Sequence, residues 1–196
     1  MAVRVYSHYC YNTLSNCYLV GPDGPGDAIL VDPSCFDTAL LSLAERHGYT
    51  IRHVFFTHCD DSHIDGVRVL RKIYDCTVYA AMPTVLDVPA HRVDHADRIA
   101  LEVGAVDVIG LPGYGRDAMA YLLNGFLFSG IALTAGEPGS VPNASALAVL
   151  VTHIEDRVMS LPDWTVILPF WGPPSTVALE RTTLQSVAAA LPELGR

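Results

Sequence analysis

The first half of the chain alternates short apolar runs with turn-forming residues, a pattern that predicts strands joined by tight connections. Three such runs, Val3–Ser7, Thr13–Val20 and Ala28–Val31, come first. Apolar residues then recur at helical spacing over Thr38–His47, and Gly48 follows, where a helix commonly ends. The chain is therefore predicted to begin with paired strands that lead into an amphipathic helix.

The rest of the chain repeats this alternation of strands and helices. Arg52–Thr57 is predicted to be a strand, and Val67–Tyr74 to be a helix. Short strands are predicted near Val78 and over Ile99–Val103, Val106–Leu111, Met119–Leu123 and Phe126–Phe128. Helices over Ala144–Ser160 and Thr176–Ala190 flank a strand at Thr165–Leu168. Two mixed sheets packed face to face with helices outside fit this order, so we expect an α/β (α+β) protein built as an αββα sandwich.

Composition limits the classes of partner. A chain of 196 residues has the length of one domain, residues 1–196, and 51% hydrophobic with 17% charged residues is typical of a globular protein. The net charge of −9 argues against a nucleic-acid partner, because phosphate binding needs a basic face. Apolar runs are too short for a membrane span, and residues 1–6 lack a signal-peptide core. We expect a cytoplasmic protein that binds neither nucleic acid nor a membrane, and we leave its oligomeric state open.

The cysteines show no pattern that predicts a disulfide. There are five of them, an odd number, and none forms a C-x-x-C pair: Cys10, Cys17, Cys35, Cys59 and Cys76. This usage favours reduced thiols, as expected in the cytoplasm.

Candidate chemistry is concentrated in Thr57–Gly66, which follows an apolar strand and precedes a helical pattern. The stretch resembles the T-H-x-H-x-D-H-x-x-G loop of the metallo-β-lactamase superfamily, whose His and Asp side chains hold two metal ions. His58 and His63 match that loop, whereas Asp60 stands at its middle His and Ser62 at its Asp.

Other segments resemble further landmarks of the same family, in the same order. They are Asn16–Val20 with Ile29–Pro33 as the opening strand pair, Leu111–Gly115 as T-P-G-H-T, Phe128–Leu133 as F-T-G-D-x-L, and Leu168–Pro174 as L-P-G-H-G-P. Tyr114 and Trp171 thereby replace metal-binding His residues, and Ile131 replaces a bridging Asp. Asp32 matches a carboxylate that supports the loop. The resemblance covers most of the chain and implies a glyoxalase II-like form of the metallo-β-lactamase fold.

The resemblance implies that no metal cofactor is held. Ser62, Ile131 and Trp171 would leave the second ion with His63 as its one ligand, whereas zinc sites generally need three. A two-metal hydrolase is therefore not expected.

At most one Zn or Fe ion remains open, held by His58, Asp60 and His63 with Asp61 in reserve. The alternative is that Asp60, Asp61 or Ser62 caps the following helix and that no ion binds.

The same residues can do acid–base chemistry without metal. A His beside a carboxylate can act as a general base, and a Tyr hydroxyl can donate a proton. The candidate catalytic residues are His58, Asp60, Asp61, His63 and Tyr114.

Four side chains are candidates for the wall of a pocket that binds a small organic molecule: Tyr114, Trp171, Ile131 and Cys59. Alternatives stay open here. The aromatic rings can fill the pocket, and Cys59 can be a buried structural residue or a nucleophile.

Two functions follow from these observations. One is a hydrolase-like enzyme that uses one metal ion or none and acts on a small ester, thioester, lactone or related compound. The other is a non-catalytic pseudo-hydrolase that binds a ligand or a protein partner. Retained His and Asp residues favour the first function, and Ile131 and Trp171 favour the second.

Overall fold

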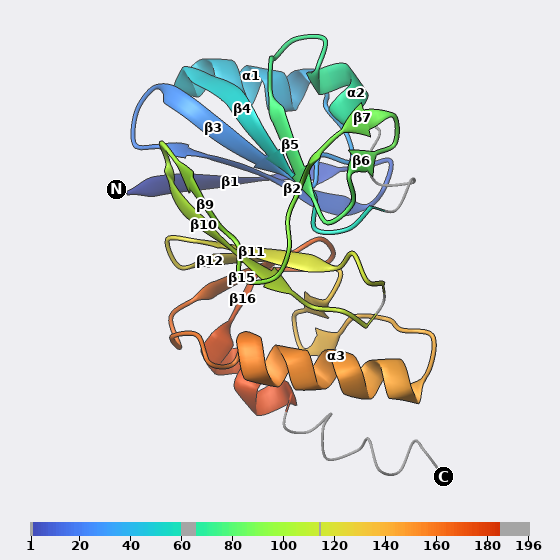
Figure 1. Ribbon diagram of the computed structural model, residues 1–196. Helices are drawn as coiled ribbons and strands as arrows, with labels where there is room; N and C mark the ends of the chain where they lie inside the picture. The colour runs from blue at the N-terminus through green and yellow to red at the C-terminus, as the bar shows by residue number, and fades with distance from the viewer. Residues whose placement is uncertain (1, 60–65, 114, 185–196) are drawn as a thin grey trace.

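Two six-stranded sheets face each other in the computed structural model, which describes residues 2–59, 66–113 and 115–184 (Figure 1). The first sheet has the order β1 (Val3–Cys10), β2 (Ser15–Pro22), β3 (Gly26–Val31), β4 (Tyr49–Phe55), β5 (Thr77–Ala80) and β8 (His91–Arg92). The second has the order β16 (Ser175–Thr176), β15 (Val166–Pro169), β12 (Phe126–Gly130), β11 (Met119–Leu123), β10 (Gly104–Gly110) and β9 (Arg98–Leu101). Two small hairpins pair β6 (Thr84–Val85) with β7 (Val88–Pro89) and β13 (Leu133–Thr134) with β14 (Glu137–Pro138).

Both sheets are mixed. In the first, β1, β2 and β3 pair as antiparallel hairpins, and β3, β4 and β5 then run parallel. Parallel neighbours need a crossover, and α1 (Thr38–His47) and α2 (Gly66–Leu70) lie in these crossovers. Asp37 caps the start of α1 by accepting a hydrogen bond from the backbone N–H of Leu40, and Gly48 ends the helix in the left-handed conformation, with φ 67°.

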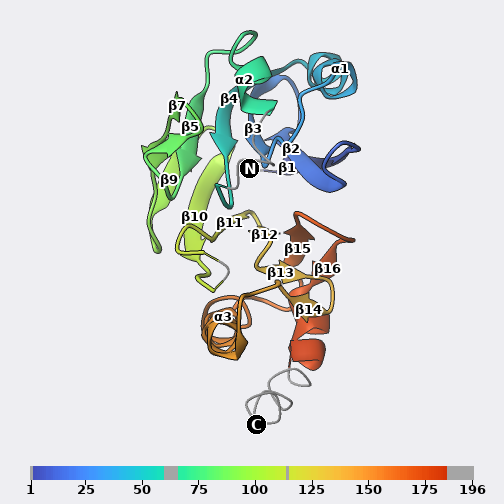
Figure 2. The same cartoon turned by 90° about the vertical axis from the view of Figure 1, so that its right-hand side faces the viewer.

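Three apolar layers hold the sandwich together. In β2, Leu19 points into a core beneath α1 and α2, whereas its neighbours Tyr18 and Val20 point into the core between the sheets. A third core lies between the second sheet and α3 (Ala144–Arg157), with residues 177–184 forming a further helix on that side. Figure 2 shows the sheets in the middle, with α1 and α2 on one side and α3 on the other. The predicted αββα sandwich is confirmed.

Some predicted boundaries were wrong. α3 ends at Arg157 instead of Ser160, and α2 is shorter than the predicted Val67–Tyr74. After Leu70 the backbone tightens: Ile73 N bonds to Leu70 O, three residues back instead of four. The end of the predicted helix Thr176–Ala190 lies outside the described residues.

The expectation of reduced cysteines is wrong for one pair. Cys10 and Cys35 form a disulfide, with their Cα atoms 5.8 Å apart. Cys10 ends β1 and Cys35 follows β3, so the sheet brings together two residues separated by 25 positions. Sequence spacing could not reveal this, because the contact depends on strand order. Cys17 and Cys76 are free thiols.

Among the described residues, no helix combines the length and the apolar character that crossing a membrane requires.

Candidate functional site

The end of β4 delivers Thr57 and His58 to one edge of the sheet, beside Asp32 from the end of the neighbouring parallel strand β3. The Thr57 N–H donates to Asp32 Oδ1 at 2.8 Å, and the Thr57 hydroxyl donates to Asp32 Oδ2 at 2.8 Å. Thr57 Oγ1 also lies 2.9 Å from His58 Nδ1. Asp32 therefore supports the loop, as expected, and the three residues form one hydrogen-bonded chain.

This chain fixes the tautomer of His58 while Asp32 is ionised. A hydroxyl carries one proton, and Thr57 gives it to the carboxylate, so His58 Nδ1 must be the donor to Thr57 Oγ1. The lone pair of the imidazole then lies on Nε2. Such a ring is oriented for a metal ion or for accepting a proton.

Burial raises the pKa of Asp32 from 3.8 to about 7, and the two hydrogen bonds from Thr57 act in the opposite direction. Asp32 as a residue is 3% exposed, so its ionised carboxylate loses most of its hydration. The backbone of Asp32 has φ 50°, an uncommon conformation for a residue with a side chain. Asp32 is thus held in place at some cost to the fold.

At two positions near these hydrogen bonds, the surrounding atoms leave room for glycine alone. A Cβ on Gly130, which has φ 60°, would lie 2.3 Å from Thr57 Oγ1. A Cβ on Gly66 would lie 2.1 Å from the carbonyl oxygen of Pro33. Both contacts are far shorter than any carbon–oxygen contact in folded proteins, so the motif glycines allow backbones to pack directly against the site.

A loop from the second sheet closes over His58. Asn16 Nδ2 donates to Pro169 O at 3.0 Å and to Gly172 O at 2.8 Å, which fixes both ends of this loop. Between them, Phe170 packs edge to face on His58, with ring centroids 4.9 Å apart and an angle of 82°. Both residues are buried, Phe170 being 1% exposed and His58 3%.

Phe170, and not the predicted Trp171, is the aromatic residue that packs on His58. Trp171 is 39% exposed and touches Phe170, with ring centroids 5.2 Å apart. The signal was present, because Phe170 stands where the L-P-G-H-G-P pattern has its first Gly. A large ring at that position has to occupy space that glycine leaves open.

The candidate pocket residues divide between two pockets. Ile131 and Trp171 line one of about 140 Å³ beside β13 and β14. Cys59 lines another of about 520 Å³, together with Met82, Thr84, Leu86, Arg116 and Asp117. The Cys59 N–H donates to Asp117 Oδ2 at 2.9 Å, a contact that no motif in the sequence indicates. Cys59 is half-buried, and in the described part of the chain its pocket is not the one lined by Trp171.

The remaining candidates lie outside the described residues: Asp60, Asp61, His63 and Tyr114. Of the candidate catalytic set and of the single-ion ligand set, His58 is the member whose position the structure gives.

Comparison with known proteins places these features in a family. The family model of the metallo-beta-lactamase superfamily matches residues 11–159, most of the chain. The chain belongs to the metallo-β-lactamase superfamily. This confirms the family expected from the motif resemblance.

Relatives of this superfamily member agree with that assignment. It is 29% identical to a hydroxyacylglutathione hydrolase of Xanthomonas euvesicatoria pv. vesicatoria over 143 residues, which are 72% of this chain and 55% of that protein. The chain thus spans about half the length of this curated relative.

Solved structures give the same fold. The metallo-beta-lactamase of Staphylococcus aureus superposes with a TM-score of 0.85 at 22% identity, covering 98% of this chain and 66% of that one. ETHE1 from Myxococcus xanthus superposes with a TM-score of 0.79 at 22% identity, covering 98% and 92%.

Proposed function

We propose that this superfamily member is a hydrolase-like protein that acts on a small ester, thioester or lactone, with His58 at its centre and at most one metal ion. Its curated relatives are hydroxyacylglutathione hydrolases, and an acyl group on glutathione is a thioester. A compound of this class is therefore the first substrate to test.

The observation that carries the proposal is the chain Asp32–Thr57–His58. A buried His that only fills space needs no oriented ring, and a buried carboxylate is unfavourable unless something requires it. Here Thr57 joins the two and presents His58 in one tautomer. A general base or a metal ligand needs this kind of fixed orientation.

The larger pocket begins at the residue after His58. Cys59 lines it with the apolar side chains of Met82 and Leu86, with the cationic Arg116, and with Asp117, whose carboxylate accepts from the Cys59 N–H. An apolar wall beside a cation suits an acyl compound that carries a carboxylate, as glutathione conjugates do. Its volume of about 520 Å³ is within the range of small-molecule sites.

The side chains at two landmark positions support the restriction to one ion. Ile131 has no donor atom, and the indole of Trp171 offers an N–H instead of a lone pair. These residues do not fit a centre of two ions. A single ion, when bound by His58 with Asp60 and His63, would polarise a carbonyl and lower the pKa of a coordinated water.

A second candidate is the non-catalytic pseudo-hydrolase, and one observation favours it. Phe170 lies against His58 and both rings are buried, which limits the approach of a substrate to the imidazole. In this case the pocket beside Cys59 binds a small organic molecule, and His58 is a structural residue.

Hydrolysis assays separate the two functions. We would measure the hydrolysis of a hydroxyacylglutathione thioester, an aryl ester and a lactone, after chelation and again with one equivalent of Zn²⁺ or Fe²⁺. We expect His58→Ala to lower the rate by about 10²-fold or more, the usual contribution of a positioned acid–base group. His91→Ala, in the exposed strand β8, is the matched control and should not change the rate.

Equal rates for the wild-type protein and His58→Ala on every substrate would reject the catalytic function. Thermal shift with the same compounds then tests the second candidate. Stabilisation that is lost in Leu86→Asp would support a binding protein whose pocket starts at Cys59.

A further inference from the structure

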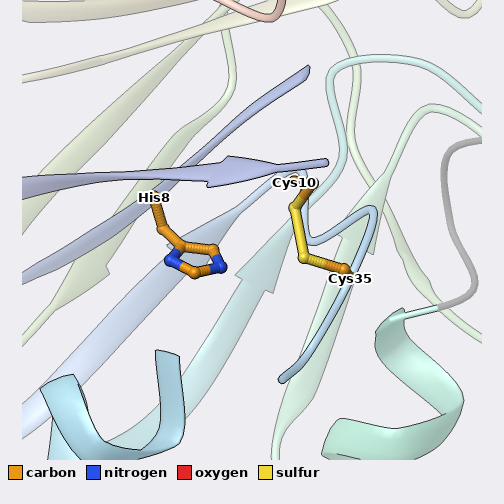
Figure 3. Close-up of side chains that lie close together, drawn as sticks. All are labelled: His8, Cys10 and Cys35. Atoms are coloured by element: carbon orange, nitrogen blue, oxygen red, sulfur yellow. A yellow bond between two sulfur atoms is a disulfide. The ribbon is translucent and has the colours of Figure 1, made fainter. Parts of the chain in front are cut away.

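A second cluster of metal-binding side chains lies at the end of β1 and contains none of Asp32, Thr57 and His58. Figure 3 shows the imidazole of His8 beside the disulfide of Cys10 and Cys35. One ring nitrogen of His8 and the two sulfur atoms lie within 4.8 Å of one another. Among the described residues, this is the group of His, Cys, Asp and Glu side chains close enough to share an ion.

The cluster is built from two segments of the chain and is partly shielded from water. His8 and Cys10 belong to β1, where alternate residues share a face, and Cys35 lies between β3 and α1. Cys10 is fully buried and Cys35 is half-buried, while the His8 side chain is 15% exposed. A small hydrated ion or a reductant therefore reaches the cluster from the side of His8 and Cys35.

A carboxylate holds the His8 ring in place. His8 Nε2 lies 3.1 Å from Asp37 Oδ2. The other oxygen of Asp37 accepts from the Leu40 N–H at 2.9 Å, which caps α1 and fixes the carboxylate itself. In zinc sites an outer carboxylate of this kind orients the histidine, and the other ring nitrogen, here Nδ1, is the one left to bind an ion.

The separations fit a tetrahedral ion once the disulfide is open. Zn–S bonds of about 2.3 Å place two sulfur ligands about 3.8 Å apart, and a Zn–N bond of about 2.1 Å places nitrogen about 3.6 Å from sulfur. The three donor atoms already lie within 4.8 Å of one another, so small side-chain rotations reach these separations once the S–S bond is open. Two thiolates and an imidazole are also a preferred ligand set of zinc, with a fourth position for water.

We propose that His8, Cys10 and Cys35 form a redox-gated zinc site. In the oxidised protein the two sulfurs are bonded to each other and cannot bind the ion as thiolates. A dithiol reductant opens the bond: it supplies two electrons and two protons, the Cys10–Cys35 bond breaks to two thiols, and the reductant becomes a disulfide. Zn²⁺ then binds the two sulfurs and His8, and the two thiol protons pass to solvent.

The proposal does not depend on the hydrolase function, because it uses none of the residues of the His58 site. It also differs from a structural disulfide. A purely structural bridge between Cys10 and Cys35 would need no histidine held beside it by Asp37.

Cobalt titration of the reduced protein tests the site. Co²⁺ replaces Zn²⁺ in tetrahedral sites, and a thiolate ligand gives an intense charge-transfer absorption in the near ultraviolet. We would reduce the protein with a dithiol, remove the reductant without oxygen, and titrate Co²⁺. One equivalent should produce this absorption, and Zn²⁺ should abolish it. The oxidised protein should show none.

Variants assign the ligands. Cys35→Ser should lose the charge-transfer band, and Cys76→Ser, which changes a half-buried free thiol outside the cluster, should keep it. Asp37→Asn keeps a good N-cap for α1 but loses the charge that holds His8, so its Kd for Co²⁺ should rise about 10–100-fold. His58→Ala should leave the titration unchanged, which separates this site from the proposed hydrolase site.

Three results would each overturn the proposal. The first is that a large excess of dithiol leaves the Cys10–Cys35 bond intact. The second is that the reduced protein shows no thiolate band with Co²⁺, and the third is that the band persists in Cys35→Ser. Circular dichroism confirms that each variant is folded. Because Cys35 is half-buried, its substitution is better tolerated than that of the buried Cys10.

Discussion

Replacing Thr57 by Val tests the hydrogen-bonded chain at its centre. Valine has the shape of threonine, so the packing against Gly130 is preserved while the hydroxyl is removed. Two hydrogen bonds disappear, the one that Thr57 donates to buried Asp32 Oδ2 and the one that it accepts from His58 Nδ1. A bond to a charged group contributes about 1.5–3 kcal/mol and a neutral one about 1 kcal/mol, so we expect a loss of about 2–4 kcal/mol.

Urea denaturation at pH 8 measures this loss, because Asp32 with its pKa of about 7 is mostly ionised there. Thr57→Ser keeps the hydroxyl and is the matched control; it should lose less than half as much as Thr57→Val. At pH 5, where folded Asp32 is protonated, the cost of Thr57→Val should fall, since no charge is left without its donor. A Thr57→Val protein within about 0.5 kcal/mol of the wild type at pH 8 would refute the role of the chain.

Three further changes follow from the same geometry. Folded Asp32, with its pKa raised to about 7, keeps a proton that the unfolded chain releases near 3.8. The contribution of Asp32 to the free energy of unfolding should therefore be full below pH 3.8 and be lost as the pH rises through 7; the difference between the wild type and Asp32→Asn in urea titrations across that range measures it. Gly130→Ala places a methyl group 2.3 Å from Thr57 Oγ1 at φ 60° and should lower the melting temperature by several degrees, which differential scanning calorimetry would detect. Phe170→Ala should cost about 3–5 kcal/mol in urea denaturation, because its ring is buried, whereas Trp171→Ala, at a 39% exposed ring, should cost less than half of that; equal losses would contradict the role assigned to Phe170.

The fold could be predicted because burial follows strand periodicity on both faces of the sheets. Leu19 and its neighbours Tyr18 and Val20 point to opposite cores, so the middle of β2 is a continuous apolar run that is recognisable from the sequence. The end of α2 was less predictable, because Ile73 has a helical spacing but closes a tighter turn.

The site was predictable where it depends on local sequence and unpredictable where it depends on strand order. The support of the loop by Asp32 followed from the motif resemblance, and the structure shows both of its hydrogen bonds to Thr57. That Phe170 and not Trp171 covers His58 depends on which side of the loop faces the first sheet, which Asn16 decides from a distant strand. The disulfide was missed for the same reason, since only the fold brings its two cysteines together.

The short connection after β3 contacts both ends of the Thr57–Gly66 motif. Asp32 holds the first residues of the motif through Thr57, and the carbonyl groups of Pro33 and Cys35 form the surface on which Gly66, at the far end of the motif, rests. Four consecutive residues thus act as a template for both ends of a ten-residue loop. A shift of this template, including one caused by opening the bridge at Cys35, would move the two ends together. The oxidation state of Cys35 and the position of His58 would then both depend on the backbone of residues 32–35.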